Sequence, residues 1–99
     1  MIIIKVQYTV KTEYVETNRR NIKQVMSDLR ALKNPDIKYS AYLEEDGCSF
    51  MHFATYPDQE TLEIATSQPS FVKFQNELKA SVPTSPPKVE HFTLVDSSY

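Results

Sequence analysis

Apolar and polar side chains alternate along the first ten residues of the chain. The even-numbered positions from Ile2 to Val10 are all apolar or aromatic, whereas the odd-numbered ones include Lys5, Gln7 and Thr9. A period of two with β-branched side chains predicts a β-strand. We expect its fully apolar face to lie under helices.

Beyond residue 18 the apolar positions recur with the period of a helix. The stripe consists of Ile22, Val25, Met26, Leu29 and Leu32. Thr17 or Asn18 is predicted to cap the start of this helix. Asn34 is predicted to end it, because Pro35 disfavours helical geometry in the residue before it. The other side of the helix carries arginines and lysines and indicates a solvent-exposed face.

Two further strands, over residues 37–44 and 48–56, are predicted to form a hairpin. Between them stand Asp46 and Gly47, a dipeptide that suits a two-residue type I′ turn, in which both central residues have positive φ. The resulting register pairs Leu43 with Phe50, Ala41 with His52, and Tyr39 with Ala54.

The second half of the chain predicts two helices and a last strand. Asp58 suits the N-cap of the first helix, which carries Leu62 and Ala65 on its apolar face. Ser67-Gln68 and Pro69 are predicted to begin the second helix. Its apolar stripe consists of Phe71, Phe74, Leu78 and Val82. Residues 84–87 are predicted to be a connector, residues 88–96 the final strand, and residues 97–99 a tail.

The element order β-α-β-β-α-α-β predicts an α+β, ferredoxin-like fold with a four-stranded antiparallel sheet and helices on one face. Residues 1–96 are expected to form one domain. The uncovered face of the sheet carries Ile3 and several aromatic side chains, which is too apolar a surface to leave in water. We therefore predict a homodimer in which two such sheets pair across a two-fold axis as a dimeric barrel.

Composition and charge narrow the class of protein. The 99 residues are 40% hydrophobic and 24% charged, as in ordinary globular domains, and no apolar run approaches the length of a membrane span. The single cysteine, Cys48, has no partner for an internal disulfide, and no secretory signal is visible, so we expect a cytoplasmic protein.

The two halves of the chain differ in charge. Residues 1–40 hold eight basic and four acidic side chains, and residues 41–99 hold three basic and nine acidic ones. A basic face for nucleic acid is one interpretation of the first half. Attraction between the halves, within one fold or across a dimer, is the interpretation we favour, since no stacking aromatics are interleaved with the basic residues. We expect neither nucleic acid nor a membrane as a partner.

Few residues carry candidate chemistry. His52 and His91 are the only side chains whose ordinary pKa lies near neutrality, and either one is a candidate general base or a hydrogen-bonded structural imidazole. Two histidines without an inward carboxylate make a weak metal site. Lys5 and Gln7 are unusual for a central strand. They are predicted to line a cavity with Tyr42 or Tyr39, or to hydrogen-bond across the two-fold axis.

Other chemistries find little support in the sequence. The acidic residues around Cys48 oppose formation of a thiolate. One glycine is too few for a phosphate-binding or dinucleotide-binding loop. No nucleophile elbow for a serine hydrolase is present. The sequence predicts no bound cofactor.

The stretch Ser49-Phe50-Met51-His52-Phe53-Ala54-Thr55-Tyr56-Pro57-Asp58-Gln59-Glu60-Thr61-Leu62-Glu63, followed by Gln68-Pro69-Ser70-Phe71, resembles the third strand and following helices of the antibiotic-biosynthesis-monooxygenase-like (ABM-like) family. Ile2–Lys11 and the long first helix fit the same pattern. The resemblance implies the dimeric α+β barrel fold. It also implies a pocket beside the sheet, in which family members oxygenate aromatic or quinol substrates without a metal.

Three positions depart from the family pattern. The strand-ending glutamate falls on Ala54, the tryptophan on Tyr56, and the helix histidine that binds iron in haem-degrading relatives on Ala65. The resemblance therefore implies no haem here. We predict a small-molecule-binding protein resembling cofactor-independent monooxygenases, with His52 as the catalytic base and Lys5, Gln7, Tyr42, Tyr56 and His91 as substrate-binding residues. The alternative is a non-enzymatic homodimeric barrel without a ligand pocket.

Overall fold

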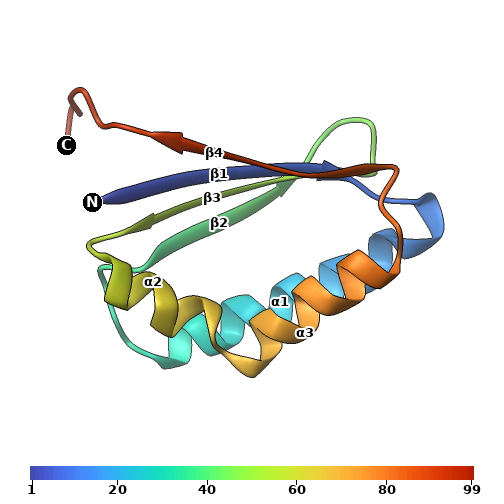
Figure 1. Cartoon of the computed structure of the whole chain (residues 1–99), viewed down its shortest axis with the longest axis horizontal. Helices are drawn as coiled ribbons and strands as arrows, with labels where there is room; N and C mark the ends of the chain where they lie inside the picture. The colour runs from blue at the N-terminus through green and yellow to red at the C-terminus, as the bar shows by residue number, and fades with distance from the viewer.

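A four-stranded antiparallel sheet lies on one side of the molecule and a layer of helices on the other (Figure 1). The computed structural model describes all of residues 1–99. Its elements are β1 (Ile2–Thr9), a 3-10 turn η1 (Thr12–Tyr14), α1 (Val15–Ala31), β2 (Lys38–Leu43), β3 (Ser49–Tyr56), α2 (Gln59–Thr66), α3 (Pro69–Ala80) and β4 (Ser85–Phe92). The strand order β2-β3-β1-β4 confirms the predicted ferredoxin-like α+β fold. None of the helices is long and apolar enough to cross a membrane.

The hydrophobic core fills the space between the sheet and the helices. The strands contribute the even-numbered side chains of β1 and β3, as the alternation predicts, and the helices contribute their apolar stripes. The buried members are Tyr8, Val10, Val25, Leu29, Phe50, Ala54, Tyr56, Ala65, Phe71, Phe74 and Leu78. Burying side chains of this size stabilises a fold by about 1.5–3 kcal/mol each.

The β2–β3 hairpin has the predicted register but not the predicted turn. Leu43 lies opposite Phe50, and the other two predicted pairs are also present. Gly47 has a φ of 79°, whereas Asp46 does not adopt a positive φ, so the two do not form a type I′ turn. Instead, residues 45–48 form a four-residue loop in which the Asp46 carboxylate accepts hydrogen bonds from the backbone N–H groups of Cys48 (3.0 Å) and Ser49. The predicted two-residue loop and the observed four-residue loop are both centred between Asp46 and Gly47, so the strands pair in the same register.

α1 starts earlier than the sequence predicts. The turn η1 leads directly into the helix at Val15, and Tyr14 and Val15 pack against the core. Asn18, predicted as a cap, therefore lies inside α1 and is fully buried. Its amide is bonded to a side chain of β1 rather than to the helix backbone.

The starts of the two shorter helices agree better with the sequence prediction than the start of α1 does. Asp58 caps α2, because its Oδ1 accepts a hydrogen bond from the backbone N–H of Thr61 at 2.8 Å. Pro69 is the first residue of α3, although Gln68 before it makes no side-chain cap.

α1 and α3 are each followed by a non-glycine residue in the left-handed region. Lys33 has a φ of 51° and Val82 a φ of 54°. This conformation costs an L-residue about 1–2 kcal/mol. The prediction that Val82 extends the core stripe of α3 is wrong: the helix ends at Ala80, where the chain turns toward β4, and the Val82 side chain is exposed.

β4 is shifted along the chain from its predicted position at residues 88–96. Its bounds are set by β1, since Ser85 lies opposite Thr9 and Phe92 opposite Ile3, close to the two ends of that strand. Residues beyond Phe92 find no further partner on β1. β4 is an edge strand, and its pairing with β1 shifts register between Gln7 and Thr9. Edge strands and such irregularities tolerate proline, and two prolines follow Ser85 here.

The face of the sheet away from the helices carries large apolar and aromatic side chains among polar ones. Figure 1 shows all the helices on one side of the sheet and none on the other. Phe53, Tyr42 and Phe92 on this open face are 39%, 53% and 45% exposed, and Ile3 is the only large apolar side chain that is buried there. The open face is thus the surface on which the predicted homodimer would form.

Candidate functional site

The six residues predicted for a site lie on both faces of the sheet. Paired residues of antiparallel strands share a face, and successive residues alternate between faces. His52 and Tyr56 point to the helices, and His91, opposite Ile4, lies on the same side at the exposed edge strand β4. The open face carries the other three predicted residues, Lys5, Gln7 and Tyr42. One pocket within a chain therefore cannot hold all six.

His52 is the centre of a buried hydrogen-bonded network. Its Nε2 lies 2.7 Å from the hydroxyl of Tyr8 on β1, and its Nδ1 lies 2.6 Å from the hydroxyl of Tyr39 on β2. Asn18 on α1 donates from Nδ2 to the Tyr8 hydroxyl at 2.9 Å. The Phe74 ring of α3 stacks on the imidazole, with ring centroids 5.4 Å apart. Three strands and two helices thus fix the position of one imidazole.

The network favours one distribution of protons. Because the Tyr8 oxygen accepts a hydrogen bond from Asn18, its own proton is satisfied by donation to Nε2 of His52. The imidazole then carries its proton on Nδ1 and donates it to the Tyr39 oxygen. The proton of the Tyr39 hydroxyl is then left without a protein acceptor in the network.

Burial holds every member of this network in its neutral form. Loss of water lowers the pKa of His52 from 6.5 to about 4, since no carboxylate lies beside the ring to favour the imidazolium. Burial likewise raises the pKa of Tyr8 and of Tyr39 well above the ordinary value for a phenol. At neutral pH the site offers hydrogen-bond donors and acceptors but no charge.

The space immediately around His52 is closed. It is bounded by the His52 and Phe74 rings, Tyr39 and three apolar side chains of α1, and it holds no volume large enough for a water molecule. Both imidazole nitrogens are already bonded to tyrosines. A ligand can therefore reach His52 only through Tyr39 or after side chains move.

The other helix-side candidates do not join this network. Tyr56 is buried in the core, where burial raises its pKa to about 12. His91 is exposed on β4, two strands away from β3. No group of three or more metal-ligating side chains lies together anywhere in the chain.

The open-face candidates contact neighbouring residues of the sheet. Lys5 forms a 4.0 Å ion pair with Glu90 on β4. Gln7 donates from Nε2 to Glu44 at 2.9 Å, beside a polar hollow of about 240 Å³ at the hairpin end of the sheet. Tyr42 is more than half exposed and makes no side-chain hydrogen bond. These three residues make up a polar part of the open face rather than an enclosed pocket.

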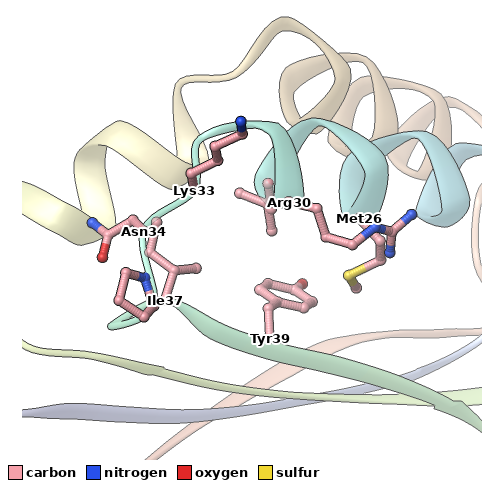
Figure 2. A pocket seen from close by; sticks show the side chains of 8 residues that line it. Met26, Arg30, Lys33, Asn34, Ile37 and Tyr39 are labelled. Carbon is pink, nitrogen blue, oxygen red and sulfur yellow. The ribbon is translucent and has the colours of Figure 1, made fainter.

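A groove of about 550 Å³ opens between the end of α1 and the start of β2. Figure 2 shows Met26, Arg30 and Lys33 above it, from α1 and the turn that follows, and Ile37 and Tyr39 below. The complete lining is Met26, Leu29, Arg30, Lys33, Asn34, Pro35, Ile37 and Tyr39. Its volume lies in the range of small-molecule sites, roughly 300–1,000 Å³. Tyr39 belongs to both the groove and the buried network, and so connects the two.

Several solved structures with this arrangement are named as antibiotic biosynthesis monooxygenases. No protein-family model matches the chain, and no curated protein matches it by sequence. A crystal structure of an antibiotic biosynthesis monooxygenase superimposes with a TM-score of 0.81 at 16% identity, covering 97% of this chain and 100% of the other. The chain has the antibiotic biosynthesis monooxygenase fold.

Two further structures with the ABM-like fold agree. Rv0793 from Mycobacterium tuberculosis gives a TM-score of 0.81 at 15% identity, covering 99% of this chain and 98% of that one. SnoaB, a cofactor-independent oxygenase from Streptomyces nogalater, gives 0.65 at 18% identity, covering 98% and 95%. At such identities the likeness confirms the resemblance seen in the sequence at the level of the fold.

Two positions of the ABM-like pattern can now be placed. Ala65, where the resemblance expects a helix histidine in haem-degrading relatives, is completely buried on α2. Tyr56, where it expects a tryptophan, ends β3 as a buried ring of the core. In this chain both positions serve packing.

Most of the network around His52 was not predicted from the sequence. Asn18 was predicted as a cap, Tyr8 as core, and Tyr39 only as an alternative to Tyr42. The predicted hairpin register already contained one signal, because it places Ala41 opposite His52 and hence Tyr39 diagonally beside it on the same face. The contribution of Asn18 had no such signal, since it depends on how α1 crosses the sheet.

Proposed function

We propose that the protein binds a small aromatic or quinol molecule in the groove between α1 and β2 and that it acts as a cofactor-independent oxygenase. One observation carries the proposal. Tyr39 lines a groove of ligand size and is at the same time hydrogen-bonded to a buried neutral histidine. The fold shared with structures named as a monooxygenase and as a cofactor-independent oxygenase supports the same conclusion.

In this proposal His52 is the proton acceptor and Tyr39 relays the proton from the ligand. For this step the imidazole must change tautomer, so that its own proton moves to Nε2 and is accepted by the Tyr8 oxygen, and the free Nδ1 then takes the proton of Tyr39. A phenol that loses its proton becomes more electron-rich and reacts more readily with dioxygen, which is the oxidant. The pKa of His52, about 4, lies some six units below that of an ordinary phenol, so the transfer costs about 8 kcal/mol. The best substrates are therefore aromatic compounds whose hydroxyl is more acidic than that of tyrosine.

We further propose that the protein forms a homodimer. Phe53, Tyr42 and Phe92 leave an apolar surface on the open face that a second copy of the same sheet would cover. In such a dimer Lys5 and Gln7 would lie at the interface. A cytoplasmic location is proposed from the single cysteine of the chain.

A second candidate function is a non-enzymatic homodimeric module. It is favoured by the closed space around His52 and by the two tyrosines that occupy both imidazole nitrogens. In that case the network only holds β1, β2 and β3 together, and the groove is an unoccupied hollow of the surface.

Thermal unfolding in the presence of quinols, phenols and small aromatic carboxylates distinguishes the two candidates. A ligand that binds the folded state raises the midpoint, and at one hundred times its Kd it adds about 2.7 kcal/mol to stability. We expect a rise with at least one class of compound, and loss of that rise in Tyr39→Phe. Tyr99→Phe, which removes the same atom from the exposed C-terminal residue, is the control.

Oxygen uptake with the best-binding compound then tests the activity itself. Uptake that depends on the protein and falls in His52→Gln supports the oxygenase. Binding without uptake leaves a ligand-binding protein, and a whole panel without any rise in midpoint favours the module without a pocket.

A further inference from the structure

Two cations stand at the rim of the α1–β2 groove without an acidic partner. Arg30 is in the last turn of α1 and Lys33 follows the helix, and both line the groove. No carboxylate lies within 4 Å of either side chain, and no acidic residue is part of the lining. The groove therefore combines a net positive rim with a floor built largely of apolar and aromatic atoms.

The end of α1 does not cancel this positive charge. A helix C-terminus carries about half a negative charge, against two full positive charges from Arg30 and Lys33. The carbonyl groups of Leu29 and Arg30 are moreover bonded to the N–H groups of Leu32 and Lys33. An anion at the rim thus meets a favourable field.

The floor of the groove offers a second kind of contact. Ile37 and the ring of Tyr39 lie below the rim in Figure 2. An aromatic ring packs well on another ring in an offset or edge-to-face arrangement.

We propose that the ligand of this groove is an aromatic carboxylate, with its ring on Ile37 and Tyr39 and its carboxylate between Arg30 and Lys33. The proposal rests on the function proposed above and specifies its substrate class as a hydroxylated aromatic ring that also carries a carboxylate. A carboxylate on a flat ring fits both halves of the site, because the guanidinium of Arg30 binds two carboxylate oxygens at once while the ring covers the apolar floor.

Chemical-shift titration of the 15N-labelled protein tests the proposal with two probes of the same shape. 1-Naphthoate carries the charge and 1-naphthamide does not. At low salt we expect naphthoate to bind roughly three- to tenfold more tightly, the range that two exposed ion pairs supply. The largest shifts should fall on the amides around Lys33 and Tyr39, and the preference should shrink in 0.5 M NaCl, where exposed charges are screened.

Four variants separate charge from backbone effects. Arg30→Gln and Lys33→Gly remove the two cations, and each should weaken naphthoate binding about three-fold while leaving naphthamide binding unchanged. Lys79→Gln removes one positive charge from α3, away from the groove, and Val82→Gly repeats the backbone change of Lys33→Gly at the other left-handed position. Neither control should alter the binding of either probe.

The outcomes distinguish failure of this inference from failure of the proposed function. Equal binding of both probes at the groove overturns the preference for a carboxylate but leaves a small-molecule site. Naphthoate binding that survives Arg30→Gln, or that shifts amides all over the basic surface, overturns it as well. If neither probe binds, and the phenols and quinols also fail, the proposed function falls with it.

Discussion

The two faces of the sheet are built from the same strands but differ in completeness. On the face toward the helices, Tyr8 and His52 have partners for their hydrogen-bonding atoms and aromatic neighbours within packing distance. On the open face, large side chains such as Phe53 and Phe92 remain half exposed. One residue of shift along a strand separates these two environments.

The difference between the two faces indicates which residues stabilise the subunit and which serve binding or association. A closed aromatic layer with a neutral histidine stabilises the subunit and admits a ligand only at its margin, where Tyr39 meets the groove. The exposed apolar side chains of the open face instead form a surface for association. Substitutions on the two faces should therefore change different properties of the protein.

The largest difference is expected between Phe74→Ala and Phe53→Lys. Phe74 is buried against His52 and Phe71, so its truncation leaves a cavity and should cost about 3–5 kcal/mol of unfolding free energy, measured in urea. Phe53→Lys places a charge on the open face and should convert the predicted dimer to a monomer in analytical ultracentrifugation. Phe74→Ala should leave the association state as it is.

Two results would contradict this division. A wild-type chain that sediments as a monomer at micromolar concentration removes the dimer. Equal losses of unfolding free energy in both variants, with no change in association, would mean that the two faces do not differ in function.

The buried imidazole should make the closed face sensitive to acid. The pKa of His52 in the folded protein, about 4, is below its ordinary value of 6.5, so the unfolded chain takes up the proton first as the pH falls. The stabilisation is fully present above pH 6.5, is lost between pH 6.5 and 4, and amounts to about 3 kcal/mol in total.

Urea unfolding at pH 7 and pH 4.5 measures this loss. The wild type should lose about 2–3 kcal/mol more than His52→Gln, which has no titrating ring, while the carboxylates titrate alike in both. His91→Gln, a change at the exposed histidine, should keep the wild-type dependence. A His52→Gln variant with an unchanged pH profile would show that His52 is not buried in neutral form.

The smallest effects concern the two left-handed residues that follow α1 and α3. Lys33→Gly and Val82→Gly should each raise the unfolding free energy by about 1 kcal/mol, since glycine adopts a positive φ without steric cost. Thermal or urea unfolding of both variants checks this. Destabilisation by Lys33→Gly alone would indicate that its side chain supports the fold in addition to lining the groove.

Local patterns in the chain were sufficient for the element order and for the hairpin register. The alternation in β1, the helical stripes and the position of Gly47 each depend on residues near one another, and steric and burial rules act on them directly. The bounds of β4 could not be obtained in this way. They depend on β1, more than seventy residues earlier, which supplies hydrogen-bond partners only as far as Ile3 opposite Phe92.

The candidate site could likewise be predicted from the sequence only in part. His52 stood out in the sequence because it is one of two side chains with an ordinary pKa near neutrality, and the register already brought Tyr39 to its side. The closure of the space around His52, the burial of Asn18 and the unpaired state of Arg30 at a groove depend on how α1 and α3 lie on the sheet.

The sequence by itself determined which face of each strand is apolar, where the helices lie along the chain, and hence the ferredoxin-like fold. Only the tertiary structure decided that His52 is neutral and enclosed, that Lys5 and Gln7 are on the opposite face from it, and that Tyr39 joins its network to a groove. The reason is physical: periodicity is a property of neighbours along the chain, whereas desolvation and hydrogen-bond partners come from segments that only folding brings together.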